Sequence, residues 1–386
     1  MERVDVAIIG AGPAGLATAL GARRAGARKV TVFELQREPG LVRRGEIVRA
    51  DARLVTALSE GIYERHSVNV ITAYRYFSAS GRRFYDRSNF KPPQVITFTP
   101  FVQEVAELAR KEGVRLVTGA QVLGLRTEKG VCRGLRVRTD GTAVEVEAHT
   151  VIGAGGTHCP STSHSSVDRR AIDCPILKME YAGLDLENEA RLEFHVDARP
   201  GVPPAAGFIF PRGGGAAEVG YVVFADCMRR RLPAAGPALD GLYESFLARH
   251  ARFANALAGA GRTLRTYHHI PMGGYAADET PTPGLLTVGD RTSHITAGGG
   301  SGVNASLRMG LLIGGLAGEL AAAGTAWTPG VAASVSKTIR ANGLRRQLRL
   351  EFGLVRPFRK LVFNLLGDPR AIDNAWPFIS LCLRFL

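Results

Sequence analysis

Glycines near the start of the chain have the spacing of a phosphate-binding turn. Residues 10–15 read Gly-Ala-Gly-Pro-Ala-Gly, a G-x-G-x-x-G pattern. The first glycine of such a turn allows the bend, the second lets a pyrophosphate approach the backbone, and the third lets a helix pack on a strand. The helix that follows offers free N–H groups and a positive dipole end to phosphate. We therefore expect Gly10, Gly12, Ala14 and Gly15 to bind the diphosphate of a dinucleotide.

An acidic residue, Glu34, follows at the distance expected for a ribose ligand. A buried strand is predicted over residues 4–9, a helix over 16–25, and a second strand over 30–33, which ends on Glu34. A carboxylate at this point can accept hydrogen bonds from ribose hydroxyls. Because it would repel a 2′-phosphate, NADP is not expected at this site.

A second glycine-and-acid pair indicates that the dinucleotide is FAD. Gly289-Asp290 ends a strand predicted over residues 285–288, and a glycine-rich stretch at 297–305 precedes a helix predicted from 306 to about 323. An acid at a strand end can bind ribityl hydroxyls, and a helix N-terminus can stabilise negative charge on a reduced flavin ring. The residues expected to contact the flavin here are Gly289, Asp290, Gly302, Val303 and Asn304.

Three side chains are candidates for proton transfer or nucleophilic chemistry. His294 lies just after the Gly-Asp pair, where a neutral imidazole could deliver a proton to substrate; the alternative is a structural histidine. Cys159, next to His158 after a Gly-Gly turn, could be a reactive thiolate or a small packed residue. Glu46 could pair with Arg44, which could bind FAD phosphate or an anionic substrate head, or the two could form an ordinary surface pair.

The composition is that of a globular protein. The chain has 386 residues, of which 45% are hydrophobic and 22% charged, so global disorder is excluded. Its five cysteines show no metal-type spacing, and we expect no metal site. The longest apolar stretch, residues 310–324, is short for a membrane span and contains Glu319. The N-terminus lacks signal-peptide features, so we expect a cytoplasmic protein.

Positive charge is concentrated near the C-terminus. The formal net charge is +14. Residues 337–370 contain nine basic and two acidic residues, which is half of this excess. Large apolar residues alternate with the basic ones, which is typical of a segment in a membrane interface and less so of a nucleic-acid site. We predict peripheral membrane contact through residues 343–386, with Pro357 breaking any single helix, and no nucleic-acid partner. The alternatives are a helix docked on the protein and an arginine-rich codon bias.

These motifs require an α/β architecture. We expect a Rossmann-like FAD-binding domain with an inserted antiparallel substrate sheet and a C-terminal helical tail. Further predicted elements are a helix at 100–112 and strands at 114–117, 122–137, 144–151, 192–196, 206–210 and 219–224. The expected boundaries are 1–74, 98–170 and 266–325 for the FAD domain, 75–97 and 171–265 for the substrate domain, and 326–386 for the tail.

Four segments resemble the geranylgeranyl reductase family of flavoproteins, which has the p-hydroxybenzoate hydroxylase fold. They are residues 10–34, 151–156, 207–212 (followed by 218–220), and 270–274 with 289–290. The resemblance implies that Val122 contacts adenine through its backbone and that Phe208, Phe210 and Pro211 lie beside the substrate cavity. Three departures stand out. Arg44-Gly45-Glu46 lacks the cysteine that archaeal reductases have before Gly-Glu, Gly155 replaces the family's usual acid, and residues 302–305 are closer to aromatic hydroxylases.

The resemblance implies hydride transfer to a C=C bond of an isoprenoid or lipid-like substrate, with electrons from NAD(P)H or ferredoxin. One alternative is a flavin monooxygenase acting on an aromatic or polyketide substrate. Another is a module that binds FAD or lipid without turnover. A halogenase is less expected, since the chain has no Trp-x-Trp-x-Ile-Pro motif and its two tryptophans are Trp327 and Trp376.

Overall fold

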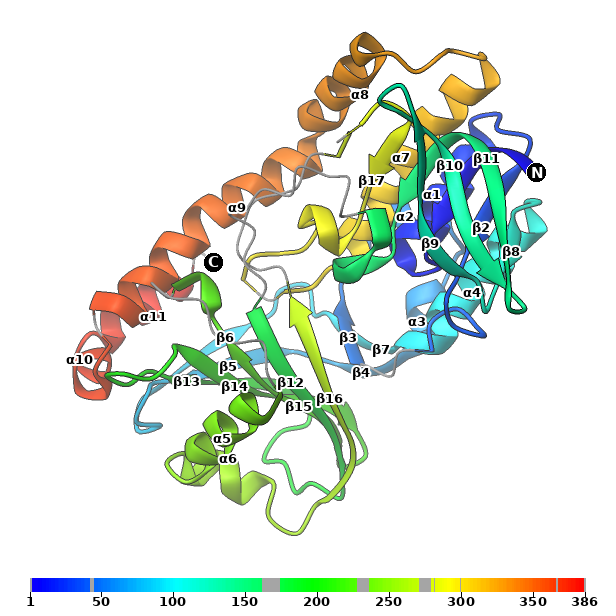
Figure 1. Ribbon diagram of the computed structural model, residues 1–386. Helices are drawn as coiled ribbons and strands as arrows, with labels where there is room; N and C mark the ends of the chain where they lie inside the picture. Colours follow the sequence, from blue (N-terminus) through cyan, green and yellow to red (C-terminus); the bar gives the residue numbers. More distant parts are fainter. Residues whose placement is uncertain are drawn as a thin grey trace.

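The structure is a computed structural model with two large β-sheets and a helical C-terminal segment (Figure 1). It describes residues 2–41, 45–161, 174–227, 236–270, 279–280, 282–298, 300–365 and 367–384. Arg44 and the segment 271–274, both singled out in the sequence, lie outside the described residues.

The first sheet carries the N-terminal glycine-rich turn. Its strand order is β8-β2-β1-β11-β10-β9, and β17 pairs with β11. The strands β8, β2, β1, β11 and β17 are parallel, so their carboxyl ends meet at one edge. The bounds are β1 Glu2–Ile9, β2 Val30–Phe33, β8 Arg115–Val117, β9 Gln121–Glu128, β10 Val131–Thr139, β11 Thr142–Gly153 and β17 Leu285–Thr287.

The strand predicted over residues 122–137 is in fact two strands. A turn with positive φ at Lys129 and Gly130 separates β9 from β10. A third antiparallel strand, β11, follows a turn at Asp140 and Gly141, both of which have positive φ. The sequence prediction failed here because Lys129 is not a residue type that marks a left-handed turn.

Helices α1 (Pro13–Arg24) and α7 (Val303–Ala322) pack against each other beside this sheet, and α4 (Phe98–Lys111) lies next to α1. Glycines allow the close approach: a Cβ on Gly314 would lie 2.1 Å from the Thr18 carbonyl, and one on Gly21 2.4 Å from that of Leu311. Among the described residues, α7 alone is long and apolar enough to cross a membrane, and half of its apolar window is buried. Its contacts with α1 are those of a helix in a domain core.

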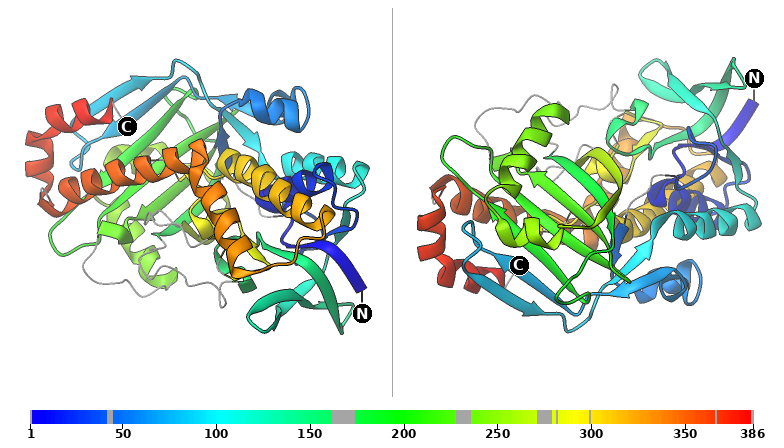
Figure 2. Two further views of the ribbon diagram at one scale, coloured as in Figure 1. Left: turned by 90° about the horizontal axis from the view of Figure 1, so that it is seen from above. Right: turned by 90° about the horizontal axis from the view of Figure 1, so that it is seen from below.

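The second sheet is mostly antiparallel, with strand order β16-β12-β15-β14-β13-β5-β6. Helices α5 (Gly236–Leu247) and α6 (Ala251–Ala256) cover one face (Figure 2). Strand β16 continues past the expected boundary at residue 265. The bounds are β5 Ala73–Phe77, β6 Phe84–Ser88, β12 Cys174–Ala182, β13 Arg191–Asp197, β14 Ala205–Gly213, β15 Ala216–Val223 and β16 Gly261–Ile270.

A small sheet connects the two large ones. Its order is β3-β7-β4, with β3 at Gly45–Val48, β7 at Gln94–Thr97 and β4 at Ser67–Val70. Two short helices, α2 (Ala52–Ala57) and α3 (Ile62–His66), lie between β3 and β4 in the chain.

The C-terminal segment forms helices α8 (Pro329–Ala341), α9 (Gly343–Lys360), α10 (Pro369–Asn374) and α11 (Trp376–Leu383). The prediction that Pro357 ends a helix is wrong, because Pro357 lies inside α9 and a π-helical turn follows at Leu361–Leu365. The buried side chains Phe352 and Val355 dock α9 on the second sheet. Tertiary packing thus outweighs the loss of one helical hydrogen bond.

Candidate active site

The parallel strands of the first sheet bring four separate motifs to one edge. Strand β1 runs into Gly10, β2 into Glu34, β11 into Ala154-Gly155, and β17 into Gly289-Asp290. Because these strands are parallel neighbours, the residues after their carboxyl ends lie together, where open α/β sheets bind ligands. The edge therefore collects the two glycine turns and the two acids predicted to hold a dinucleotide.

The glycine turn has one open position, at Gly12. A Cβ on Gly10, where φ is +96°, would lie 2.9 Å from the Ala154 carbonyl oxygen, and one on Gly15 would lie 1.9 Å from that of Gly10. Around a Cβ on Gly12, by contrast, no atom lies within 4 Å. Gly12 is also the N-cap of α1, whose first N–H groups have no intrahelical partner. The space at Gly12 therefore fits a pyrophosphate at a helix N-terminus.

Glu34 lies across the mouth of this turn. Its carboxylate accepts hydrogen bonds from the Ala11 N–H at 2.6 Å and from the Gln36 N–H at 2.9 Å. The Ala120 N–H donates to the Glu34 carbonyl at 2.8 Å, which places the start of β9 and Val122 close by. The Val122 side chain is buried in the core below. These residues fit the ribose and adenine end of FAD.

The Gly289-Asp290 turn joins the first turns of α1 and α7. Gly289 has φ +90°, and its Cβ would lie 3.0 Å from the Ala14 Cβ. A Cβ on Gly302, the N-cap of α7, would lie 3.1 Å from Asp290 Oδ1. The Asp290 carboxylate therefore sits beside the α7 N-terminus, as expected for ribityl and flavin-ring contacts.

Asn304 and Val303 anchor the start of α7. Asn304 Oδ1 accepts a hydrogen bond from the Tyr63 hydroxyl at 3.0 Å, and its Nδ2 donates to the Arg49 carbonyl at 2.6 Å. Burial raises the pKa of Tyr63, so the hydroxyl stays a donor. The Val303 side chain is buried in the core. Both side chains therefore position the helix, and no motif in the sequence pointed to Tyr63.

His294 is enclosed rather than open to a cleft. Its side chain is 0% exposed, and Nδ1 accepts a hydrogen bond from the Gly289 N–H at 3.2 Å. The proton of the neutral ring is therefore on Nε2, which faces Glu279 Oε1 at 3.7 Å. Burial lowers the pKa of His294. This arrangement holds the Gly289 turn in place, and a role in proton delivery stays a prediction.

Glu279 links this turn to the C-terminal helix. Arg345, from the first turn of α9, contacts the same Glu279 oxygen that faces His294. Burial opposes ionisation of Glu279, but His294 and Arg345 outweigh it and lower the pKa of Glu279 to about 2. An ionised carboxylate thus sits between an arginine and a neutral histidine, directly beside the Gly289-Asp290 turn.

Cys159 and Glu46 lie near the same edge. The Cys159 side chain is 1% exposed, and its sulfur accepts a hydrogen bond from the Ser161 hydroxyl at 3.1 Å. The sulfur would also lie 3.1 Å from a Cβ on Gly155. Glu46 is half-buried on β3, opposite Ile96 of β7. The structure packs Cys159 as a small buried residue, and chemistry at either side chain stays a prediction.

The second sheet turns an aromatic face toward the loop after Asp290. Tyr76, Phe194 and Phe208 are directly opposed on neighbouring strands, and the rings of Tyr76 and Phe194 stack with centroids 5.3 Å apart. Phe210 lies on the same face, 4.4 Å from Phe208 between ring centroids. This aromatic face packs against the residues Ile295, Ala297, Phe352 and Val355, so the sheet, the loop and α9 meet here.

Phe208 is held flat by a glycine on the next strand, because a Cβ on Gly220 would meet the Phe208 ring at 1.9 Å. Pro211 is buried in the same strand, β14. The three predicted cavity residues thus belong to this strand, with Phe208 and Phe210 on the aromatic face. Phe194 was not predicted, because the cross-strand register that aligns it with Phe208 cannot be read from one strand alone.

A charged pair shares the aromatic face. Lys178 of β12 and Glu218 of β15 lie 2.9 Å apart, with side chains 15% and 2% exposed. Lys178 is opposite Gly220, and Glu218 is opposite Phe210, so both point to the aromatic face. Among the described residues, no group of three or more His, Cys, Asp or Glu side chains could hold a metal ion.

The fold and this edge define an FAD-dependent oxidoreductase, and comparisons with known proteins agree. Residues 5–157 match the family model of FAD dependent oxidoreductases. The chain is 26% identical over 315 residues to the digeranylgeranylglycerophospholipid reductase of Methanosarcina acetivorans, covering 77% of this chain and 71% of that protein. It is 24% identical to the enzyme of the same name from Thermoplasma volcanium, covering 81% and 77%.

Solved structures show the same fold. A geranylgeranyl bacteriochlorophyll reductase-like protein from Thermoplasma acidophilum superposes with a TM-score of 0.79 at 20% identity, covering 98% of this chain and 92% of that one. A flavin-dependent brominase superposes with a TM-score of 0.71 at 14% identity, covering 98% and 93%. Taken together, these comparisons show that the chain has the fold of FAD-dependent oxidoreductases and is similar to geranylgeranyl reductase-like proteins among them.

Proposed function

We propose that the protein reduces a C=C bond in an apolar, isoprenoid or lipid-like substrate. The observation that carries this proposal is the aromatic face, because its rings lie opposite the loop that follows Asp290, the proposed ribityl ligand. Rings of this size supply a large apolar contact area and little hydrogen-bonding capacity. The names of the relatives, which describe reductases of geranylgeranyl lipids, support the same substrate class.

FAD, when bound and reduced, supplies a hydride to one carbon of the double bond, and a proton must reach the other carbon. Gly12 and Glu34 would hold its diphosphate and ribose, and Asp290 its ribityl chain. The aromatic face would hold the substrate chain and exclude water. Lys178 is the candidate proton donor on this face, because its ammonium group shares the face with Phe208 and Phe210 and lies 2.9 Å from the Glu218 carboxylate.

A flavin monooxygenase is the second candidate. The chain is 30% identical over 203 residues to a 3-(3-hydroxy-phenyl)propionate/3-hydroxycinnamic acid hydroxylase of Burkholderia cenocepacia, covering 50% of this chain and 36% of that protein. Arg44 also stands where archaeal reductases carry a cysteine. NAD(P)H or ferredoxin is the proposed electron donor in the reductase case, and NADPH in the monooxygenase case.

Anaerobic reoxidation separates these candidates. The holoenzyme is photoreduced without oxygen and mixed with a geranylgeranyl lipid or, as a matched control, with its fully saturated analogue. Recovery of flavin absorbance with the unsaturated lipid alone, together with a product two hydrogens heavier, is the expected result. Oxygen consumption coupled to product, with no anaerobic reoxidation, would favour the monooxygenase. No reoxidation by any substrate or by oxygen would favour a module that binds FAD or lipid without turnover.

A further inference from the structure

Helix α9 has an inner face that fixes its orientation. Apart from its apolar contacts, α9 makes polar contacts with described loop residues at the cofactor edge, which is the edge of the first sheet where Gly10, Glu34 and Asp290 meet. Arg345 contacts Glu279, Arg359 donates to the Ala297 carbonyl at 2.9 Å, and the Gly298 N–H donates to Glu351 at 3.1 Å. Arg345 and Arg359 are each only 7% exposed. Two of the nine basic residues of segment 337–370 are therefore buried in contacts within the protein.

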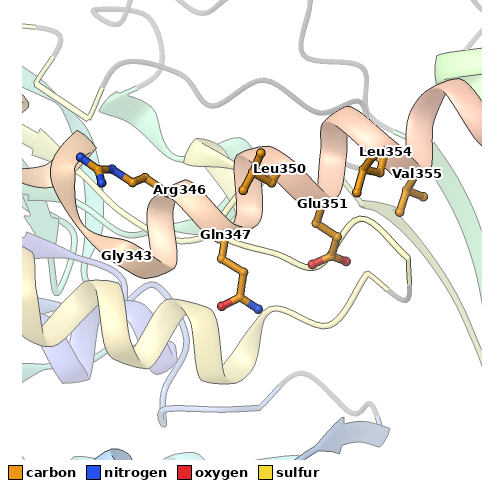
Figure 3. A pocket seen from close by; sticks show the side chains of 7 residues that line it. All are labelled: Gly343, Arg346, Gln347, Leu350, Glu351, Leu354 and Val355. Atoms are coloured by element: carbon orange, nitrogen blue, oxygen red, sulfur yellow. The ribbon is translucent and has the colours of Figure 1, made fainter. Parts of the chain in front are cut away.

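The opposite side of α9 exposes large apolar side chains. Leu350 is 69% exposed, Leu354 66% and Leu361 37%. At about 100° per residue these leucines and Pro357 fall on one stripe. Figure 3 shows Leu350 and Leu354 projecting together from one side of the helix, away from Glu351. Single exposed leucines are common, but an aligned row on one helix face is a contact surface.

Basic side chains form a second stripe beside the leucines. Arg346, Arg349 and Lys360 are exposed and lie next to Leu350 and Leu354 around the helix axis. The one acidic residue of α9 is Glu351, and it is bonded to the Gly298 N–H. From Arg346 to Leu361 this outer face is about 22 Å long at about 1.5 Å per residue. In both Figure 1 and the left view of Figure 2, α9 lies along the outside of the molecule.

We propose that this outer face of α9, made by Arg346, Arg349, Leu350, Leu354 and Lys360, docks on an anionic lipid bilayer. Parallel stripes of cationic and aliphatic side chains suit the boundary between lipid headgroups and acyl chains. The negatively charged cytoplasmic leaflet supplies the complementary charge. A two-fold dimer through this face would bring like charges together. Nucleic acid would leave the exposed leucines without an apolar partner. The proposal is independent of the reaction, because docking is measured without turnover.

The test is co-sedimentation of the full-length holoenzyme with vesicles of phosphatidylglycerol and phosphatidylcholine. We expect binding at low salt, partial release at high salt, and little binding to phosphatidylcholine alone. The variant Arg346→Gln/Arg349→Gln/Lys360→Gln should bind roughly 100-fold more weakly and lose most of its salt dependence. The variant Leu350→Ser/Leu354→Ser should bind at least about tenfold more weakly while keeping its salt dependence.

A matched control removes three exposed charges from a distant surface. Arg28→Gln/Arg110→Gln/Lys111→Gln has the same change in net charge but leaves α9 intact, so it should bind vesicles like the parent protein. Retained flavin absorbance shows that each variant is folded. Unchanged binding by both α9 variants, or equal losses in the control, would overturn the proposal. So would binding to a DNA duplex in preference to vesicles, or dimerisation in sedimentation velocity that the leucine variant abolishes without affecting vesicle binding.

Discussion

Substitution of Gly12 by valine should remove FAD and leave the fold intact. Gly12 has φ −76° and ψ 179°, an extended conformation open to any residue, and a Cβ there meets no protein atom within 4 Å. The cost to folding is therefore the weaker N-cap alone, about 1 kcal/mol or less. The valine methyl groups would instead occupy the space of the pyrophosphate. Losing two charge-assisted hydrogen bonds at about 1.5–3 kcal/mol each predicts an affinity loss of at least about 100-fold.

Gly15→Ala is the matched contrast. A Cβ on Gly15 would lie 1.9 Å from the Gly10 carbonyl oxygen, far inside van der Waals contact. The turn and α1 must separate, which should cost about 1–3 kcal/mol of folding free energy or more. Urea denaturation of the apoproteins measures this cost, and quenching of flavin fluorescence measures FAD affinity. Gly12→Val should therefore lose FAD affinity but little stability, whereas Gly15→Ala should lose folding stability.

Two results would refute this reasoning. If Gly12→Val binds FAD with nearly the affinity of the parent protein, the open space is not the pyrophosphate site. If Gly12→Val is instead as unstable as Gly15→Ala, the space is not available in the folded protein.

Three further predictions concern side chains around the cofactor edge. Asp290→Ala should weaken FAD binding in equilibrium dialysis about 10- to 100-fold, and more than Glu34→Gln, which keeps an amide acceptor; the reverse order would contradict the ribityl assignment. Burial lowers the pKa of His294, so the unfolded chain binds its proton first, and stability falls as pH drops below about 6.5. In urea titrations, His294→Asn should reduce the pH dependence of the unfolding free energy in this range by up to about 1.4 kcal/mol per pH unit. An unchanged pH dependence would argue against a buried neutral His294. Lys178→Met should slow anaerobic reoxidation at least about tenfold with unchanged FAD affinity, because it removes the proposed proton donor. Normal turnover by Lys178→Met would exclude Lys178 as proton donor.

The cofactor edge could be predicted from the sequence because its signals are local. A strand, a glycine turn and a helix follow each other within residues 4–24, and an acid at the end of the next strand completes the pattern. Parallel pairing then brings Gly289 and Asp290 to the same edge, although they lie far away in the chain. Short-range patterns of this kind need no knowledge of the rest of the fold.

The substrate side could not be predicted in the same way. The stacking of Tyr76 on Phe194 depends on the register of two parallel strands more than a hundred residues apart. The Lys178–Glu218 pair depends in the same way on the pairing of β12 with β15. The enclosure of His294 could not be predicted either. Its position after the Gly-Asp pair suggested that it faces a cleft, whereas in the folded chain Glu279 lies beside it and Arg345 contacts the same Glu279 oxygen.

The C-terminal helix unites the two proposals about this protein. The contacts of Arg345 and Arg359 with the loops at the cofactor edge are spread along most of α9, so the helix cannot roll about its axis without breaking them. The outer stripe of leucines therefore has a fixed direction relative to the aromatic face, against which Phe352 of the same helix packs. A bilayer bound to that stripe would lie one helix diameter, about 10 Å, from this face. An apolar substrate would then pass from the membrane to the aromatic face with little exposure to water. This matters because transfer of apolar surface into water is unfavourable.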